Sequence, residues 1–187
     1  MRTQNILLAG SLMLVLAAGA HAAEVDLNVN DNAARLTLGL PLGNNVLVDG
    51  SWLHHNDNGD VVSVGAHVTG AASGVDPLQA GLGVRFNYIY NDRGDEEDGT
   101  ALGMGGFLRY TLPQYDRFSF GGSLYYSPEV LSFGDIEKFY EYGLWSSYSL
   151  IKDADIYLGW RTMKAEFKSD GTERMDTGFH VGMRVRF

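Results

Sequence analysis

The sequence contains no cysteine and only four prolines, and beyond residue 23 it has no long apolar run. The lack of cysteine excludes a disulfide framework but decides little else, because many exported and many cytosolic proteins share it. The lack of a long apolar run is more informative, since a membrane-spanning helix needs roughly 20 predominantly apolar residues. If the mature chain crosses a bilayer, it must therefore do so as a closed β-barrel, which satisfies its backbone groups internally.

One shorter apolar run lies near the N-terminus, at residues 6–18. It follows Arg2 and precedes small residues that end in Ala-His-Ala-Ala at 20–23. This pattern is typical of a secretory signal peptide with a cleavage site after Ala22, and the run is too short for a membrane anchor. We therefore expect residues 1–22 to be removed and residues 23–187 to form a single domain.

Basic residues are scarce in the mature chain. Removal of residues 1–22 leaves 13 basic against 23 acidic residues, a net charge of −10. Nucleic-acid-binding domains carry basic patches, so this balance argues against nucleic acid as a partner.

The mature chain does show a strict alternation of apolar and polar residues. In its last segment one face of a two-residue period is apolar and the other is polar or charged, which is typical of a strand between lipid and a polar interior. The chain stops on an aromatic residue, Phe187, which resembles the terminal signal read by the outer-membrane barrel assembly machinery. These features predict a protein of the outer membrane of a Gram-negative bacterium. The apolar face comprises Phe179, Val181, Met183, Val185 and Phe187, and the other face His180, Gly182, Arg184 and Arg186.

The same alternation predicts an all-β fold, a transmembrane antiparallel up-and-down β-barrel of ten strands. Pro41, Pro77 and Pro113 lie 36 residues apart beside short turns, which fits a hairpin that recurs at this interval. Eight strands, with the two short N-terminal segments merged or unpaired, are the alternative count. A soluble barrel or sandwich with its apolar faces turned inward is the alternative fold. The predicted strands are 24–30, 34–41, 46–55, 61–70, 78–90, 100–112, 117–127, 139–150, 155–167 and 177–187.

The predicted connections fall into two sets. One set shares the end at which the chain stops, and the other set is mostly longer and more acidic. Outer-membrane barrels have short periplasmic turns and longer outer loops, flanked by aromatic girdles, so the first set is assigned to the periplasm. The periplasmic connections are 42–45, 71–77, 113–116 and 151–154, and the outer ones are 31–33, 56–60, 91–99, 128–138 and 168–176. The predicted lipid-facing residues are Leu78, Ala80, Leu82, Val84, Phe86, Phe118, Phe120, Leu124, Ile156, Leu158 and Trp160. The predicted outer girdle is Trp52, Tyr88, Tyr90, Tyr126, Tyr140 and Tyr142, and the inner one Phe118, Tyr110, Tyr148 and Phe187.

Inward positions combine charged residues with many glycines. Buried charges must pair or be hydrated, and the inward set has an excess of three positive charges, so either water and anions enter or other polar groups compensate. A barrel of about eight strands is just filled by side chains, so ten strands lined by glycine leave more space. A wet, positively charged lumen favours anions. The predicted lumen residues are Arg35, Arg85, Arg109, Arg117, Arg161, Arg184 and Arg186, against Glu24, Asp26, Asp49 and Glu141.

Two groups of side chains offer chemistry near the outer rim. A Ser/His/acid set for nucleophilic catalysis can be drawn from Ser127, Ser132, His54, His55, Asp57 and Asp60. The two histidines point to opposite faces of one strand, however, and this favours a polar turn. The other group is the acidic segment Asp92, Asp95, Glu96, Glu97 and Asp98, whose oxygens suit a divalent cation. It lacks the spacing of an EF-hand, so a solvated loop is the favoured interpretation.

Two segments carry a resemblance to a known family. Ser51-Trp52-Leu53-His54-His55-Asn56-Asp57-Asn58-Gly59-Asp60-Val61 has the pattern strand, Asn/Asp/Gly turn, strand, and Tyr125-Tyr126-Ser127-Pro128-Glu129-Val130-Leu131-Ser132 has a strand followed by a Ser-Pro loop. Both are similar to the YfaZ family of small Gram-negative outer-membrane proteins. The resemblance implies an outer-membrane barrel and carries over no activity and no catalytic residue.

Two functions remain in view, with a third as a remote alternative. The first is a narrow channel for small solutes with a mild preference for anions, and the second is a filled structural or surface-interaction barrel without transport. An outer-rim lipid-modifying enzyme is the remote alternative, and we expect no enzyme, no cofactor and no transition-metal site. The expected partners are outer-membrane lipids and lipopolysaccharide, with the barrel assembly machinery during biogenesis. We expect a monomer.

Overall fold

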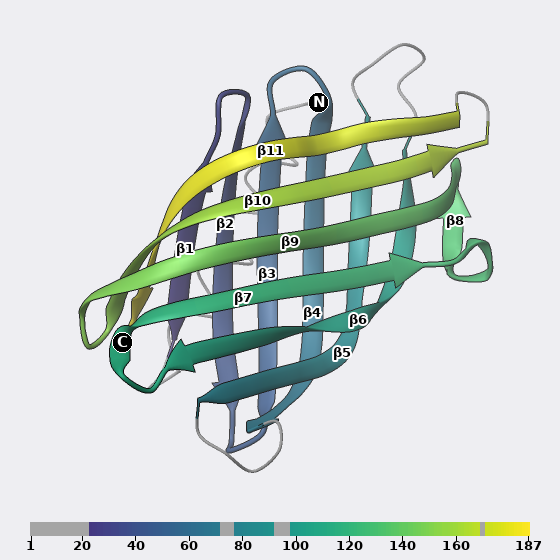
Figure 1. The fold of residues 1–187 in the computed structure, drawn as a ribbon. Coiled ribbons are helices and arrows are strands. Elements are labelled where there is room, and N and C mark those ends of the chain that lie inside the picture. Colours follow the sequence, from purple (N-terminus) through teal and green to yellow (C-terminus); the bar gives the residue numbers. More distant parts are fainter. Residues whose placement is uncertain (1–22, 72–76, 92–97, 169–170) are drawn as a thin grey trace.

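The computed structural model describes residues 23–71, 77–91, 98–168 and 171–187. Ten long antiparallel strands close into a barrel, and an additional strand of three residues is attached to it (Figure 1). The strands are β1 (Glu24–Val29), β2 (Ala33–Leu42), β3 (Val46–His55), β4 (Gly59–Ala71), β5 (Leu78–Tyr90), β6 (Asp98–Leu112), β7 (Tyr115–Ser127), β8 (Ser132–Gly134), β9 (Ile136–Ile151), β10 (Ala154–Phe167) and β11 (Gly171–Arg186).

The register of the first and last strands closes the barrel. Glu24 of β1 lies opposite Arg186 of β11, and Val29 lies opposite Val181. The other long strands pair with their chain neighbours, except that β7 pairs with β9 because the short β8 lies between them in sequence and pairs with β6. Closure leaves none of the long strands with an unpaired edge, which removes the main aggregation risk of a sheet. The prediction of ten strands is confirmed, and the alternative of eight is wrong.

Two predicted outer connections differ from the structure. The segment 128–138 contains a short 3-10 helix, η2 (Glu129–Leu131), and then β8. The segment 168–176 is mostly strand, because β11 already begins at Gly171. A β-bulge explains this error: Met175 is an extra residue in β11, so it and Asp176 both lie inside and interrupt the period of two. No helix among the described residues is long and apolar enough to cross a membrane.

The connections define two ends of the barrel. We call the turn end the one with connections 43–45, 113–114 and 152–153, and the loop end the one with connections 30–32, 56–58 and 128–135. The C-terminus lies at the turn end, beside the turn between β9 and β10 (Figure 1). There the backbone N–H of Phe187 donates to the carbonyl of Ala23 at 2.9 Å.

Apolar side chains cover the outer wall. Leu82 is 72% exposed and Leu124 is 61% exposed, although both lie inside paired strands. Aromatic pairs occupy the two margins, with Phe118 against Tyr148 near the turn end and Tyr126 against Tyr140 near the loop end. An apolar band between aromatic girdles is the surface of an outer-membrane barrel. The soluble alternative, which needs inward apolar faces along the strands, does not fit this wall.

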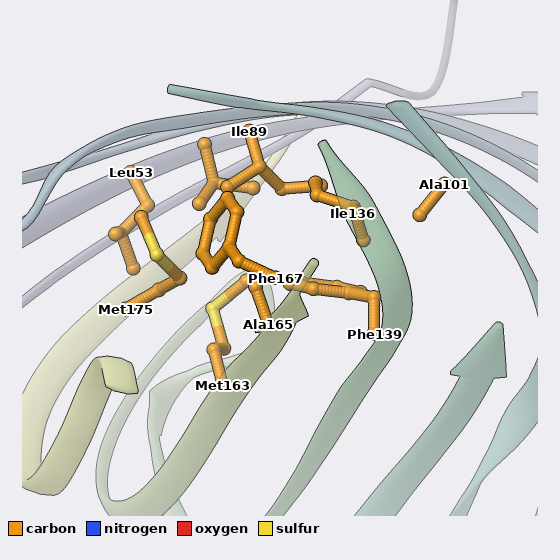
Figure 2. Close-up of a cluster of buried hydrophobic side chains, with 10 residues drawn as sticks. Leu53, Ile89, Ala101, Ile136, Phe139, Met163, Ala165, Phe167 and Met175 are labelled. Atoms are coloured by element: carbon orange, nitrogen blue, oxygen red, sulfur yellow. The ribbon is translucent and has the colours of Figure 1, made fainter. Parts of the chain in front are cut away.

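Inside the barrel, the loop end is filled by an apolar cluster that we call the apolar plug. Its side chains extend from both walls toward a common centre, with Phe167 of β10 beside Ile89 of β5 (Figure 2). None of them is more than 2% exposed. The turn between β3 and β4 adds to this closure, because Asn58 donates to the carbonyls of Arg174 at 2.8 Å and Met175 at 3.2 Å on β11. The plug consists of Leu53, Val61, Ile89, Ala101, Ile136, Phe139, Met163, Ala165, Phe167 and Met175.

Candidate functional site

Between the apolar plug and the turn end the interior is polar. The first of its three networks of polar contacts is centred on Glu141 of β9. One carboxylate oxygen accepts from Arg35 Nη1 at 2.7 Å, and the other accepts from Arg85 Nη1 at 3.0 Å. The Glu141 side chain is 4% exposed and the two arginine side chains are 10% and 11% exposed. Hydrogen bonds between ionised groups are the strong class, and burial protects these from screening by salt.

The same network continues through Asp49 toward the opposite wall. Arg85 Nη2 donates to Asp49 at 3.2 Å, and the other oxygen of Asp49 lies 3.1 Å from Nδ1 of His67. The Tyr125 hydroxyl lies 2.8 Å from Nε2 of His67, and the Arg85 guanidinium lies 4.1 Å from the centre of the Tyr125 ring. The imidazole of His67 therefore lies between a carboxylate on its Nδ1 side and a hydroxyl on its Nε2 side. Strands β3, β4, β5 and β7 are thereby linked through one chain of polar contacts.

A second network joins β1, β10 and β11. Arg161 Nε donates to Asp176 at 2.6 Å, and its Nη1 donates to the side-chain oxygen of Asn28 at 2.8 Å. The Asn28 amide donates to the Tyr157 hydroxyl at 2.9 Å, and that hydroxyl donates to Asp26 at 2.6 Å. These contacts tie the first strand of the barrel to the last two, so they support the closing seam.

A third network lies at the turn end around Asp155, which is 1% exposed. Its carboxylate accepts from Arg109 Nη2 at 3.2 Å and from Arg186 Nη2. Arg186 also donates to Glu24 at 3.1 Å, and Arg184 lies 3.2 Å from the same carboxylate group. These contacts join β6, β10 and β11 to β1 at the turn end of the interior.

The predicted excess of positive charge is wrong. Arg117 was expected in the lumen, but it is only the third residue of β7, beyond the ion-paired layers, and it is exposed. Asp155 and Asp176 were not expected there, yet both are 1% exposed and bind interior arginines. Among the described residues, six arginines therefore face six carboxylates. The arginines are Arg35, Arg85, Arg109, Arg161, Arg184 and Arg186, and the carboxylates are Glu24, Asp26, Asp49, Glu141, Asp155 and Asp176.

The interior glycines were expected to leave open space, but several of them are covered by aromatic or imidazole rings. The Trp145 ring covers Gly121, and a Cβ on that glycine would lie 2.4 Å from the indole. The two residues are direct partners across β7 and β9, so the missing side chain on one strand makes room for the ring on the next. Three other pairs are built in the same way, namely Phe107 over Gly81, His180 over Gly159 and Tyr157 over Gly182.

A cavity of about 390 Å³ remains among these networks. Its wall includes Trp145 and Tyr157 as well as Asn44 in the turn between β2 and β3, so it reaches the turn end. This volume is at the lower end of the range for small-molecule pockets. The interior therefore has two parts, an apolar plug at the loop end and a polar chamber at the turn end.

The rim residues are not brought together into a catalytic set. His54 lies on the outer face, 3.0 Å from Asp60, whereas His55 is buried and lies 3.3 Å from the Asn58 amide. The hydroxyls of Ser127 and Ser132 lie 3.2 Å from each other, and neither has a hydrogen bond to these histidines among the described residues. Asp57 lies in the turn beside His55.

The acidic segment lies mostly outside the described residues, which leave out Asp92, Asp95, Glu96 and Glu97. Asp98 is described: it opens β6, and its carboxylate accepts from the Tyr88 hydroxyl at 2.7 Å. Within the described ranges no group of three or more His, Asp or Glu residues is arranged to hold a metal ion.

A family model described as "YfaZ precursor" matches residues 3–187. The chain belongs to the YfaZ family. Among curated proteins it is similar to the outer membrane protein YfaZ of Escherichia coli (strain K12), with 28% identity over 98% of this chain and 99% of the relative. This YfaZ-family chain is accordingly an outer-membrane protein.

Solved structures add the same fold. The barrel is similar to the NanC porin, with a TM-score of 0.53, 10% identity, and coverage of 89% of this chain and 99% of that chain. It is also similar to the KdgM porin in complex with disordered oligogalacturonate, with a TM-score of 0.48, 13% identity, and coverage of 89% and 99%. The likeness to NanC shows that the YfaZ-family chain has a porin-like barrel fold. Because the sequence identity is low, the interior of this chain is interpreted from its own residues.

Proposed function

We propose that this YfaZ-family protein is a closed barrel, a structural or surface-interaction protein of the outer membrane that conducts no solutes in the conformation described here. The loop end faces the cell exterior and the turn end faces the periplasm, as the lengths of the connections favour. The observation that carries this proposal is the apolar plug, which occupies the barrel at one end, while the chamber, as its described lining residues show, opens at the other.

The ion-paired interior supports the same function. A lumen that selects ions presents an excess of one sign of charge, whereas the arginines and carboxylates here balance and are mostly used in bonds to each other. Breaking such buried pairs to pass a solute is costly. The proposal includes the absence of enzymatic activity, because His54 and the two rim serines are each engaged with other partners.

A gated narrow channel is the second candidate, and two observations favour it. The fold is porin-like, and a chamber of about 390 Å³ already occupies the half of the interior toward the turn end. Passage of a solute would then require the apolar plug to move, so this candidate is a gated channel and not an open pore.

Single-channel recording in planar bilayers tests the proposal. Wild type is expected to show no current steps above the bilayer background. The variant Phe139→Ala with Phe167→Ala empties the centre of the apolar plug and is expected to conduct. A matched control is Phe118→Ala with Phe120→Ala, which removes two exposed rings from the outer wall and is expected to stay silent.

Each buried Phe→Ala change costs about 3–5 kcal/mol, so folding of every variant is checked by heat-modifiable migration on gels. The single variant Phe139→Ala serves if the double variant fails to fold. Steady current steps from the folded wild type would refute the closed barrel and establish the channel. Silence from folded plug variants would show that the polar networks, and not the plug, close the interior.

A further inference from the structure

A row of four outward-facing side chains crosses the outer wall near the loop end. The register places Tyr126 opposite Tyr140, Tyr140 opposite Lys164, and Lys164 opposite Arg174. The four residues come from the neighbouring strands β7, β9, β10 and β11, which at about 4.8 Å per strand gives a row about 14 Å long. The two tyrosine rings are 5.1 Å apart, and Arg174 is exposed. We call these residues the tyrosine–cation row.

The sequence neighbours of this row show on which face of the wall it lies and how close it is to the loop end. Phe139 and Met163 directly precede Tyr140 and Lys164, and Met175 directly follows Arg174. All three neighbours belong to the apolar plug, so the row lies on the opposite, outer side of the same wall. Farther toward the turn end the wall becomes apolar, with Leu158 55% exposed and Phe179 72% exposed. The row therefore lies at the margin between the apolar band and the loops.

The charges of the row are unbalanced within the protein. Lys164 and Arg174 are direct cross-strand partners, and like charges in this position destabilise a sheet. Neither side chain forms an ion pair with another residue in the described part of the chain. One step closer to the loop end the contrast is clear, because Lys138 lies 3.2 Å from Glu166 on the adjacent strand. An anion bound between Lys164 and Arg174 removes the repulsion.

The opposite side of the barrel has the reverse chemistry at the loop end. There Asp60 accepts hydrogen bonds from Trp52 at 2.9 Å and lies 3.0 Å from His54. These residues belong to β3 and β4, across the barrel from the tyrosine–cation row. At the loop end, the basic side chains without an ion pair among the described residues therefore lie on one side of the barrel.

We propose that the tyrosine–cation row binds a phosphate group of lipopolysaccharide in the outer leaflet. Lipid phosphates lie at the level where the apolar band of a membrane protein ends, and basic residues at that level attract anionic lipid. Lys164 and Arg174 supply charge and donors, and the Tyr140 hydroxyl between β7 and β10 supplies one more donor. The proposal rests on the orientation given under Proposed function, but it does not depend on whether the barrel conducts.

Binding of purified lipopolysaccharide to the folded barrel in neutral detergent tests this inference. The variant Lys164→Gln with Arg174→Gln is expected to bind about 30-fold more weakly, since each basic residue near an anionic lipid surface contributes a factor of about five. The matched control is Arg117→Gln with Lys152→Gln, which removes the same charge from exposed positions at the turn end and is expected to bind like wild type. The exchange Lys164→Arg with Arg174→Lys keeps both charges and is expected to retain binding.

Three probes identify the ligand group. The same glycolipid with its phosphates removed is expected to bind wild type as weakly as the double Gln variant binds the intact lipid. Inorganic phosphate is expected to compete only at far higher concentration. Equal weakening in both double Gln variants, or undiminished binding of the dephosphorylated lipid, would overturn the proposal, and so would inorganic phosphate binding as tightly as the lipid. Conductance is not part of this readout, so failure here is distinguishable from failure of the closed-barrel proposal.

Discussion

Replacement of Glu141 by glutamine tests whether the buried network holds the barrel together. Glu141 accepts from two arginines, one on each of its oxygens, and its side chain is 4% exposed. A glutamine keeps one acceptor oxygen but directs its amide group at the second guanidinium, so one of the two buried arginines loses its contact with this position and the ionic charge that balances both is removed. Removing one member of a buried ion pair costs about 3–5 kcal/mol, and we expect Glu141→Gln to lower the free energy of unfolding by about 3 kcal/mol.

The matched control is Glu166→Gln on the neighbouring strand. Glu166 also contacts a basic residue, Lys138 at 3.2 Å, but the two side chains are 28% and 33% exposed. Exposed ion pairs contribute about 0.2–1 kcal/mol, so this variant is expected to unfold almost as wild type does.

Urea unfolding of the barrel in lipid vesicles, followed by tryptophan fluorescence, measures both free energies. The two variants lose the same charge, so the difference between them reports burial and bonding rather than net charge. If Glu141→Gln unfolds within about 1 kcal/mol of Glu166→Gln, then the ion pairs of the interior contribute no more than surface pairs and the reasoning is refuted.

Three further predictions concern assembly, orientation and packing. Deletion of Phe187 is expected to lower the amount of heat-modifiable barrel in cells, because the terminal aromatic is the predicted assembly signal; an unchanged yield would contradict this. Because the chain has no native cysteine, Glu129→Cys at the loop end is expected to react with an impermeant maleimide on intact cells, while Lys152→Cys at the turn end is not. The reverse labelling pattern would invert the orientation. Gly121→Val is expected to destabilise the barrel by at least about 1–3 kcal/mol, since a Cβ there would lie 2.4 Å from the Trp145 ring, and urea unfolding measures the loss.

Local alternation was enough to predict the ten long strands. In the C-terminal strand the apolar residues from Phe179 to Phe187 do lie on the outer face, and the basic residues Arg184 and Arg186 do lie inside. Successive side chains of a strand point to opposite faces, and in a membrane barrel these faces contact lipid on the outside and a polar interior on the inside. The same rule failed at Asp176, because the bulge at Met175 shifts the period by one residue.

The candidate site was less predictable, because its contacts join residues that are far apart in the sequence. Arg35 and Glu141 meet across the barrel, and the pattern around either residue gives no indication of the other. Which inward side chains meet depends on the tilt and stagger of the closed sheet, which a single strand does not encode. The apolar plug was missed for a related reason: near the loop end the inward residues such as Leu53 and Phe167 are apolar too, so the assumption of a uniformly polar lumen concealed them. Asp155, in contrast, lies on the same strand face as Arg161 and was recognisable from alternation alone.

In the closed barrel that we propose, the apolar plug turns the polar interior into a compartment that opens, among the described residues, at the turn end. In the proposed orientation, a molecule that approaches from the cell exterior meets the apolar plug before the acids and arginines beneath it. The same orientation opens the chamber toward the periplasm, so the proposal implies that the interior has the solute composition of the periplasm and not that of the growth medium. A barrel of this kind interrupts the outer membrane without weakening it as a permeability barrier.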